Sequence, residues 1–92
     1  MDMSDCPRIL REFLTYHETI KGQSRRTISE YYLDLRMFFR FLIVFRDDRL
    51  PYDYDLNQVS IQDVDLNFVS RITPTEIYEF FVYLGNDRVY HT

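Results

Sequence analysis

The sequence predicts an all-α domain, a compact bundle of four helices in which the third is short. Apolar residues recur at helical spacing, three or four positions apart, in four stretches of the chain. Two of these stretches open on residues that commonly cap a helix. No stretch alternates apolar and polar residues between hairpin turns, so the sequence indicates no sheet. At 92 residues the whole chain is expected to form a single domain.

The first helix is predicted over residues 7–20. Pro7 suits a first helical turn, where its missing N–H is not needed. The side chains of one face then recur at helical spacing: Ile9, Leu10, Phe13, Leu14 and His17. Gly22 is expected to end the helix, because glycine readily adopts the left-handed conformation of a C-cap.

The second helix is predicted from about Arg25 to about Arg46, with Ser24 as its N-cap. One apolar stripe follows the helical repeat without a break: Ile28, Tyr31, Tyr32, Leu35, Phe38, Phe39 and Leu42. A second stripe lies roughly opposite: Leu33, Met37, Phe41 and Val44. A helix that is apolar on two sides is expected to be central and packed from both.

Residues 47–62 are predicted to form a connecting loop, because Pro51 and the alternating Asp and Tyr residues interrupt the helical repeat. A short third helix is predicted over residues 63–71. Its apolar side chains are Val64, Leu66, Phe68 and Val69.

The fourth helix has the strongest start signal in the chain. Thr73 is the predicted cap, Pro74 the first helical residue and Glu76 the partner of the cap in a capping box. Gly85 or Asn86 is expected to stop the helix. Its predicted inner face consists of Ile77, Phe80, Phe81 and Leu84.

Several classes of protein are disfavoured by composition. Cys6 is the only cysteine, so no intramolecular disulfide forms, which fits a reducing compartment. The N-terminus does not resemble a signal peptide, and the longest apolar stretch is too short to span a bilayer, so a soluble, cytoplasmic protein is expected. No metal-ligand spacing, paired acid and base, or phosphate-binding glycine motif occurs. We therefore expect no cofactor, no metal, no small-molecule substrate and no enzymatic activity of this chain.

The formal net charge of −4 conceals an uneven distribution of charges. Residues 20–49 carry seven Lys and Arg against four acids, whereas residues 50–92 carry two against seven. The basic segment begins with the stretch "KGQSRRT", residues 21–27, at the predicted start of the second helix. Because the local field matters more to a polyanion than the total charge, this segment is a candidate contact for DNA.

Helix N-termini suit phosphate groups, since they present free N–H groups and the positive end of the helix dipole. Arg in the first turn opposes that dipole, which favours a functional reason for its presence. The predicted DNA-binding residues are Lys21, Gln23, Ser24, Arg25, Arg26, Thr27, Arg36 and Arg40. The alternative for the turn is a solvated turn in which Ser24 merely caps. The alternative for Arg36 and Arg40 is a solvated face with one arginine paired to an acid.

The string "FLTYHETIKGQSRRTISEYYLDLRMFFRFL", residues 13–42, resembles the N-terminal core-binding domain of tyrosine recombinases of the phage-integrase and Xer type. That family has a Lys/Arg-Gly-x-Ser turn followed by a helix that continues Thr, Tyr-x-x-Asp-Leu-x-x-Phe-x-x-Phe-Leu. The matching positions here are Lys21, Gly22, Ser24, Thr27, Tyr31, Asp34, Leu35, Phe38, Phe41 and Leu42. The ending "RITPTEIYEFFVYL", residues 71–84, resembles the fourth helix of the family, with Glu76 where the family usually has Asp.

This resemblance covers about residues 8–86 and implies a SAM-like four-helix domain that forms one half of a clamp around a recombination site. It implies double-stranded DNA and, in the full-length protein, other recombinase protomers as partners. The catalytic Arg, His-x-x-Arg and Tyr set of the family is absent from this chain, so we expect a core-binding domain separated from a longer recombinase. The alternative is a helical protein-interaction module that uses the second apolar stripe or the tail in recombinase assembly or partner docking.

Overall fold

A computed structural model of the chain describes residues 2–51 and 53–88. Its α-helices are α1 (Arg8–Thr19), α2 (Arg25–Phe45), α3 (Leu66–Ser70) and α4 (Pro74–Arg88), and a 3-10 helix, η1 (Leu56–Gln58), lies between α2 and α3. The described part of the chain contains no strand, which confirms the predicted all-α class with a short third helix.

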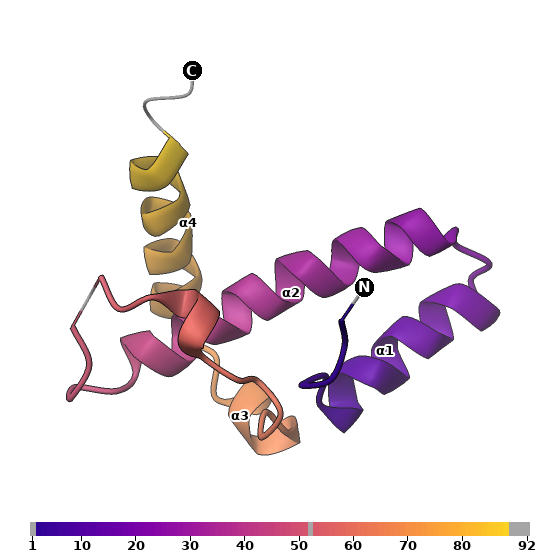
Figure 1. The fold of residues 1–92 in the computed structure, drawn as a ribbon, viewed down its shortest axis with the longest axis horizontal. Coiled ribbons are helices and arrows are strands. Elements are labelled where there is room, and N and C mark those ends of the chain that lie inside the picture. Colours follow the sequence, from indigo (N-terminus) through magenta and orange to yellow (C-terminus); the bar gives the residue numbers. More distant parts are fainter. Residues whose placement is uncertain (1, 52, 89–92) are drawn as a thin grey trace.

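The long helix α2 organises the domain. The helix α1 returns alongside α2 as a helical hairpin, and α4 stands across the C-terminal half of α2 (Figure 1). The connection after α2 passes through η1 and brings α3 beneath this crossing. The α1–α2 turn therefore lies at one end of α2, and α4 lies toward the other end.

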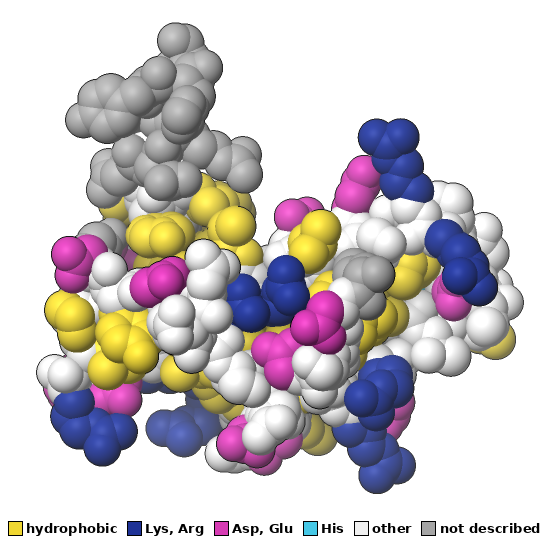
Figure 2. All heavy atoms as spheres, in the orientation of Figure 1, with side chains coloured by type: hydrophobic (Ala, Val, Ile, Leu, Met, Phe, Trp, Pro, Cys, Tyr) yellow, Lys and Arg dark blue, Asp and Glu magenta, His cyan; other side chains and the backbone are white. Residues whose placement is uncertain are grey.

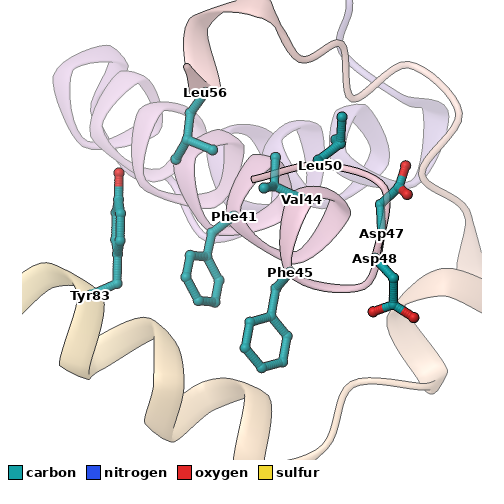
Figure 3. Close-up of a pocket in the computed structure, with 8 residues that line it drawn as sticks. All are labelled: Phe41, Val44, Phe45, Asp47, Asp48, Leu50, Leu56 and Tyr83. Atoms are coloured by element: carbon teal, nitrogen blue, oxygen red, sulfur yellow. The ribbon is translucent and has the colours of Figure 1, made fainter. Parts of the chain in front are cut away.

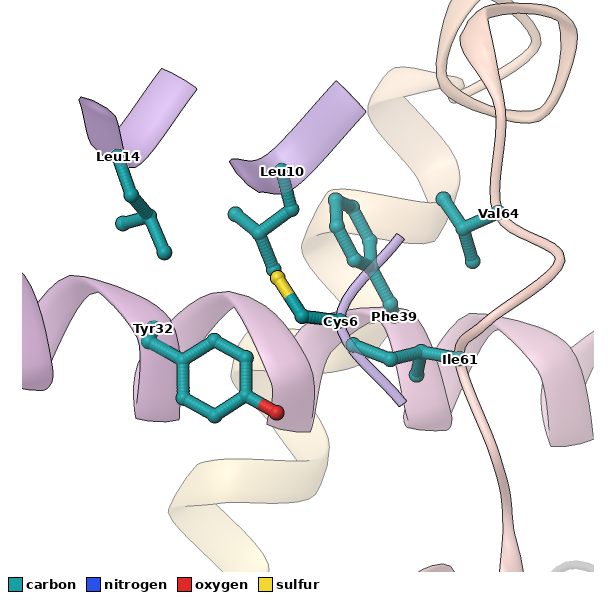
Figure 4. Packing of buried hydrophobic residues seen from close by; sticks show 7 residues of the cluster. All are labelled: Cys6, Leu10, Leu14, Tyr32, Phe39, Ile61 and Val64. Carbon is teal, nitrogen blue, oxygen red and sulfur yellow. The ribbon is translucent and has the colours of Figure 1, made fainter. Parts of the chain in front are cut away.

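The main core forms between α1 and the first apolar stripe of α2. Its buried members are Cys6, Leu10, Leu14, Tyr32, Phe39, Ile61 and Val64 (Figure 4). On the other side of α2, Phe41 packs against two α4 rings, with ring centroids 5.3 Å from Phe80 and 5.2 Å from Tyr83. Both apolar sides of α2 are thus packed, as predicted for a central helix.

Both predicted N-caps are present. The Ser24 Oγ accepts a hydrogen bond from the Thr27 N–H at 3.2 Å. In the capping box, the Thr73 N–H donates to Glu76 Oε1 at 2.9 Å, and the Glu76 N–H donates to Thr73 Oγ1 at 3.1 Å. These bonds satisfy N–H groups that a helix leaves unpaired in its first turn.

Two predictions about α4 are wrong. The helix continues through Gly85 and Asn86 to Arg88, because Gly85 does not adopt the left-handed conformation that ends a helix. Of the predicted inner face, Phe80 packs against α2 as expected, but Ile77 and Phe81 are 43% and 63% exposed, so the face that meets α2 is rotated from the predicted one. The side chains of α4 that face α2 include Glu76, Phe80 and Tyr83.

The third helix is shorter than predicted. Asp65 is its N-cap and accepts a hydrogen bond from the Phe68 N–H at 2.8 Å, so the helix begins at Leu66. The sequence predicts Val64 within the helix, but Val64 lies before the cap and is buried in the main core. The cap therefore separates the turn closed by the Val64 N–H and the Ile61 carbonyl from the short helix α3.

Candidate nucleic-acid interface

The α1–α2 turn brings three cations into solvent at one end of the domain. Lys21 is exposed, and the side chains of Arg25 and Arg26 are 96% and 90% exposed. Figure 2 shows Lys and Arg side chains standing out from the end of the molecule that carries this turn. The predicted basic turn is therefore a solvent-facing feature of the fold.

Two acids lie next to these cations. The Nε of Arg25 is 3.9 Å from Glu18 Oε2, and the Nε of Arg26 is 3.4 Å from Glu30 Oε1. Exposed ion pairs of this kind contribute only about 0–1 kcal/mol and are screened by salt. A phosphate can replace such a partner at little cost, so these weak pairs reduce the local positive field but leave the arginines able to bind an anion.

The N-terminus of α2 adds backbone donors to the same surface. The first turn of α2 contains no acid, so no side chain of that turn opposes the positive end of the helix dipole. Ser24 satisfies the N–H of Thr27 and donates its hydroxyl to Thr27 Oγ1 at 3.1 Å. The N–H groups of Arg25 and Arg26 belong to the first turn and have no acceptor within the helix. Backbone donors and cationic side chains thus converge on one helix end.

Gln23 differs from the other predicted residues of the turn because its side chain faces inward. Its Oε1 is 2.9 Å from His17 Nδ1, and its Nε2 donates to the Tyr31 hydroxyl at 3.1 Å. The residue is half-buried between α1 and α2. Nothing in the sequence pattern indicated this bridge, because it joins residues six and eight positions apart across a turn.

Arg36 and Arg40 do not join the surface of the turn. The Arg36 guanidinium lies over the Tyr32 ring, 5.1 Å from its centroid. The Arg40 side chain is only 15% exposed, its Nε donates to the Val59 carbonyl at 2.9 Å, and its Nη2 is 3.9 Å from Asp5. Arg40 is thus paired to an acid, as in the alternative in which one of these arginines has an acidic partner. Its hydrogen bond to Val59 also connects the end of η1 to α2.

The second apolar stripe, which carried the protein-interaction alternative, is only half exposed. Leu33 and Met37 are 45% and 41% exposed, but Phe41 and Val44 are buried. The part of the stripe left open to a partner is therefore its N-terminal half, since Phe80 and Tyr83 of α4 pack against Phe41. An open pocket of about 270 Å³ remains beside it, lined by Phe41, Val44, Phe45, Asp47, Asp48, Leu50, Leu56 and Tyr83 (Figure 3).

None of the described helices has the length and hydropathy needed to cross a bilayer. Within residues 2–51 and 53–88, no group of three or more His, Cys, Asp and Glu side chains is arranged to hold a metal ion.

Comparison with known proteins finds one similar protein, a tyrosine recombinase, which the chain matches over part of its length. No family model matches the sequence, and no solved structure matches it significantly. The chain is 35% identical over 91 residues to the tyrosine recombinase XerC of Caldanaerobacter subterraneus subsp. tengcongensis. The match covers 96% of this chain but 25% of that recombinase. Nearly all of this chain is therefore similar to one quarter of a tyrosine recombinase.

Proposed function

We propose that this chain is the N-terminal core-binding domain of a tyrosine recombinase and binds duplex DNA mainly through phosphate contacts. The observation that carries the proposal is the N-terminus of α2, where Lys21, Arg25 and Arg26 surround a helix end with no acid in its first turn. The similarity to a recombinase along almost the whole chain supports the same role.

In this role the domain is one half of a clamp on a recombination site, and the other half is a catalytic domain. The chain itself has no His-x-x-Arg string, so we assign strand cleavage to a part of the protein outside this sequence. Ser24 and Thr27 shape the helix end, and the cations above it contact the DNA backbone. Such contacts position a protein on DNA without reading its sequence.

A salt titration with a mixed-sequence duplex of about 30 base pairs tests the proposal by fluorescence anisotropy. A single domain of net charge −4 is expected to bind with a Kd of roughly 10⁻⁴ to 10⁻⁶ M, as in non-specific DNA binding. The double variant Arg25→Ala/Arg26→Ala should weaken binding about tenfold or more and should lower the slope of log Kd against log salt by roughly two.

Arg8→Ala is the matched control. Arg8 is also the first residue of a helix, its side chain is 89% exposed, and it pairs with Glu12 four residues later, as Arg26 pairs with Glu30. It lies at the opposite end of α1 from the basic turn, so its loss should leave the Kd within about twofold of wild type. DNA affinity that does not fall with salt would contradict the proposal. An equal loss of affinity in Arg8→Ala and in the Arg25→Ala/Arg26→Ala variant would contradict it as well.

The protein-interaction alternative is favoured by a different observation, the exposed outer face of α4. Tyr78 and Phe81 are 65% and 63% exposed on the side of the helix that turns away from α2. Large exposed rings are enriched in protein interfaces. If this face mediates assembly of recombinase protomers, Phe81→Glu should abolish any self-association seen by sedimentation while leaving duplex binding intact. A monomer at all concentrations would count against this role for the isolated domain.

A further inference from the structure

We infer that Gln23 is a positioning residue that holds the basic turn in its DNA-binding geometry, and does not itself contact phosphate. This inference rests on the proposed function, since it concerns how the same surface is built. It assigns Gln23 a role different from the direct contact that the sequence predicts.

Gln23 is tied to α1 by both its backbone and its side chain. The Gln23 N–H donates to the His17 carbonyl at 3.0 Å, and Gln23 Oε1 lies 2.9 Å from His17 Nδ1. Because an amide oxygen only accepts, His17 must donate from Nδ1 in this arrangement.

The same amide also reaches α2. Gln23 Nε2 donates to the Tyr31 hydroxyl at 3.1 Å, which closes a chain of hydrogen bonds from His17 through Gln23 to Tyr31. Gln23 therefore bridges the last turn of α1 and the second turn of α2 across the loop that joins them.

The partners of Gln23 are themselves held in place by packing. The His17 ring lies 4.4 Å from the Phe13 ring and 5.7 Å from the Tyr31 ring, measured between centroids. Phe13 and Tyr31 are also in range of each other, at 6.2 Å. Aromatic pairs in such arrangements stabilise one another beyond the effect of the area they bury. The anchor points of the bridge are thus parts of a packed aromatic cluster.

The residues on either side of Gln23 point the other way. Gly22 has a φ of 68°, which reverses the chain, while Lys21, Ser24 and Arg25 are exposed. Because the Gln23 side chain anchors this short turn between α1 and α2, the backbone that carries Lys21 and Arg25 keeps a fixed geometry in the DNA-free protein. Ordering them in the free protein removes part of the entropy loss that otherwise accompanies binding.

The test combines Gln23→Ala with Tyr31→Phe, which removes only the hydroxyl that accepts from Gln23. Each variant should raise the Kd for the mixed-sequence duplex roughly three- to tenfold, because each loses the bridge between α1 and α2. The double variant should be no worse than Gln23→Ala alone, since both substitutions break the same bridge. The slope of log Kd against log salt should stay at the wild-type value, because no charge is removed.

Backbone ¹⁵N order parameters of the free protein give a readout that does not depend on DNA. Residues 21–24 should be rigid in wild type, with values of about 0.85, and should fall toward roughly 0.6 in both variants while helix values are unchanged. Those unchanged helix values also show that each variant is folded.

Two results would overturn the inference. One is wild-type order parameters in Gln23→Ala, and the other is wild-type DNA affinity in Tyr31→Phe, since a direct phosphate contact by Gln23 does not need the Tyr31 hydroxyl. The proposed function would survive either result as long as Arg25→Ala/Arg26→Ala still weakens binding and lowers the salt slope. If that double variant binds as wild type, the proposed function fails and the inference fails with it.

Discussion

Arg46, the C-cap of α2, and Glu76, in the first turn of α4, form a two-point ion pair. Arg46 Nε is 2.6 Å from Glu76 Oε2, and Arg46 Nη2 is 3.1 Å from Glu76 Oε1. The same carboxylate accepts the Thr73 N–H, and the same guanidinium lies 4.3 Å from the centroid of the Phe68 ring in α3. This pair joins three helices at the point where α4 crosses α2.

Glu76→Ala should destabilise the domain by about 2–4 kcal/mol. The substitution removes the capping carboxylate and leaves the Arg46 side chain, which is only 23% exposed, without its acid. Urea unfolding followed by circular dichroism measures the loss. Glu12→Ala is the matched control, because it breaks the exposed pair with Arg8 and should cost less than about 0.5 kcal/mol. Similar losses of unfolding free energy in Glu76→Ala and Glu12→Ala would show that the Arg46–Glu76 pair stabilises the domain no more than an exposed surface pair does.

Stability should fall in acid partly because of this same carboxyl. The hydrogen bond from Arg46 is the main cause that holds the pKa of Glu76 below its ordinary value of 4.5. At a pH between the lowered pKa of Glu76 in the folded chain and its ordinary pKa in the unfolded chain, the unfolded chain binds more protons. The stabilisation from this carboxylate is therefore complete above about pH 4.5 and is lost as the pH falls through the folded pKa. Unfolding free energies measured from pH 7 to pH 3 should therefore converge for wild type and Glu76→Gln. A constant gap between the two curves would contradict this assignment.

Arg40→Ala should damage the fold without changing the salt dependence of DNA binding. Its guanidinium is nearly buried and hydrogen-bonded to the Val59 carbonyl, so removal should cost roughly 1–3 kcal/mol by urea unfolding. In the duplex titration the slope of log Kd against log salt should match wild type at a temperature where both proteins are folded. A slope lowered by about one would instead place Arg40 on the DNA backbone, as the sequence predicts.

The two glycines should respond to alanine in opposite directions. Gly22 has a φ of 68°, so Gly22→Ala should cost about 1 kcal/mol even though no atom lies within 4 Å of the added Cβ. Gly85 lies inside α4 with the same open surroundings, so Gly85→Ala should stabilise the domain by roughly 0.5–1 kcal/mol. Thermal unfolding of the two variants beside wild type tests both signs. A destabilised Gly85→Ala variant would mean that α4 ends before this residue.

Local sequence signals predicted most of the helices because they act over a few residues. The Ser24 cap and the Thr73–Glu76 capping box depend on contacts three positions apart, and both are present in the structure. The end of α4 was missed for the complementary reason. A glycine permits a helix to stop but does not require it, and Gly85 retains helical geometry.

The prediction of the site was less complete, because a sequence pattern does not say which way a polar side chain turns. Arg25 and Arg26 are exposed as predicted, but their contact with DNA remains a proposal. Gln23 and Arg40 also have polar side chains, yet the Gln23 amide bridges two helices and the Arg40 guanidinium donates to the Val59 carbonyl. Helical periodicity alone does not distinguish these outcomes.

The sequence by itself determined the all-α class, the starts of α2 and α4, and the concentration of cations in the α1–α2 turn, since these depend on residues close together in the chain. Only the tertiary structure decided which face of α4 meets α2 and which cations reach solvent. The Arg46–Glu76 pair joins residues 30 positions apart, and Ile77 and Phe81 lie on the exposed side of the same helix. Contacts over such distances depend on how the helices cross, which no local pattern encodes.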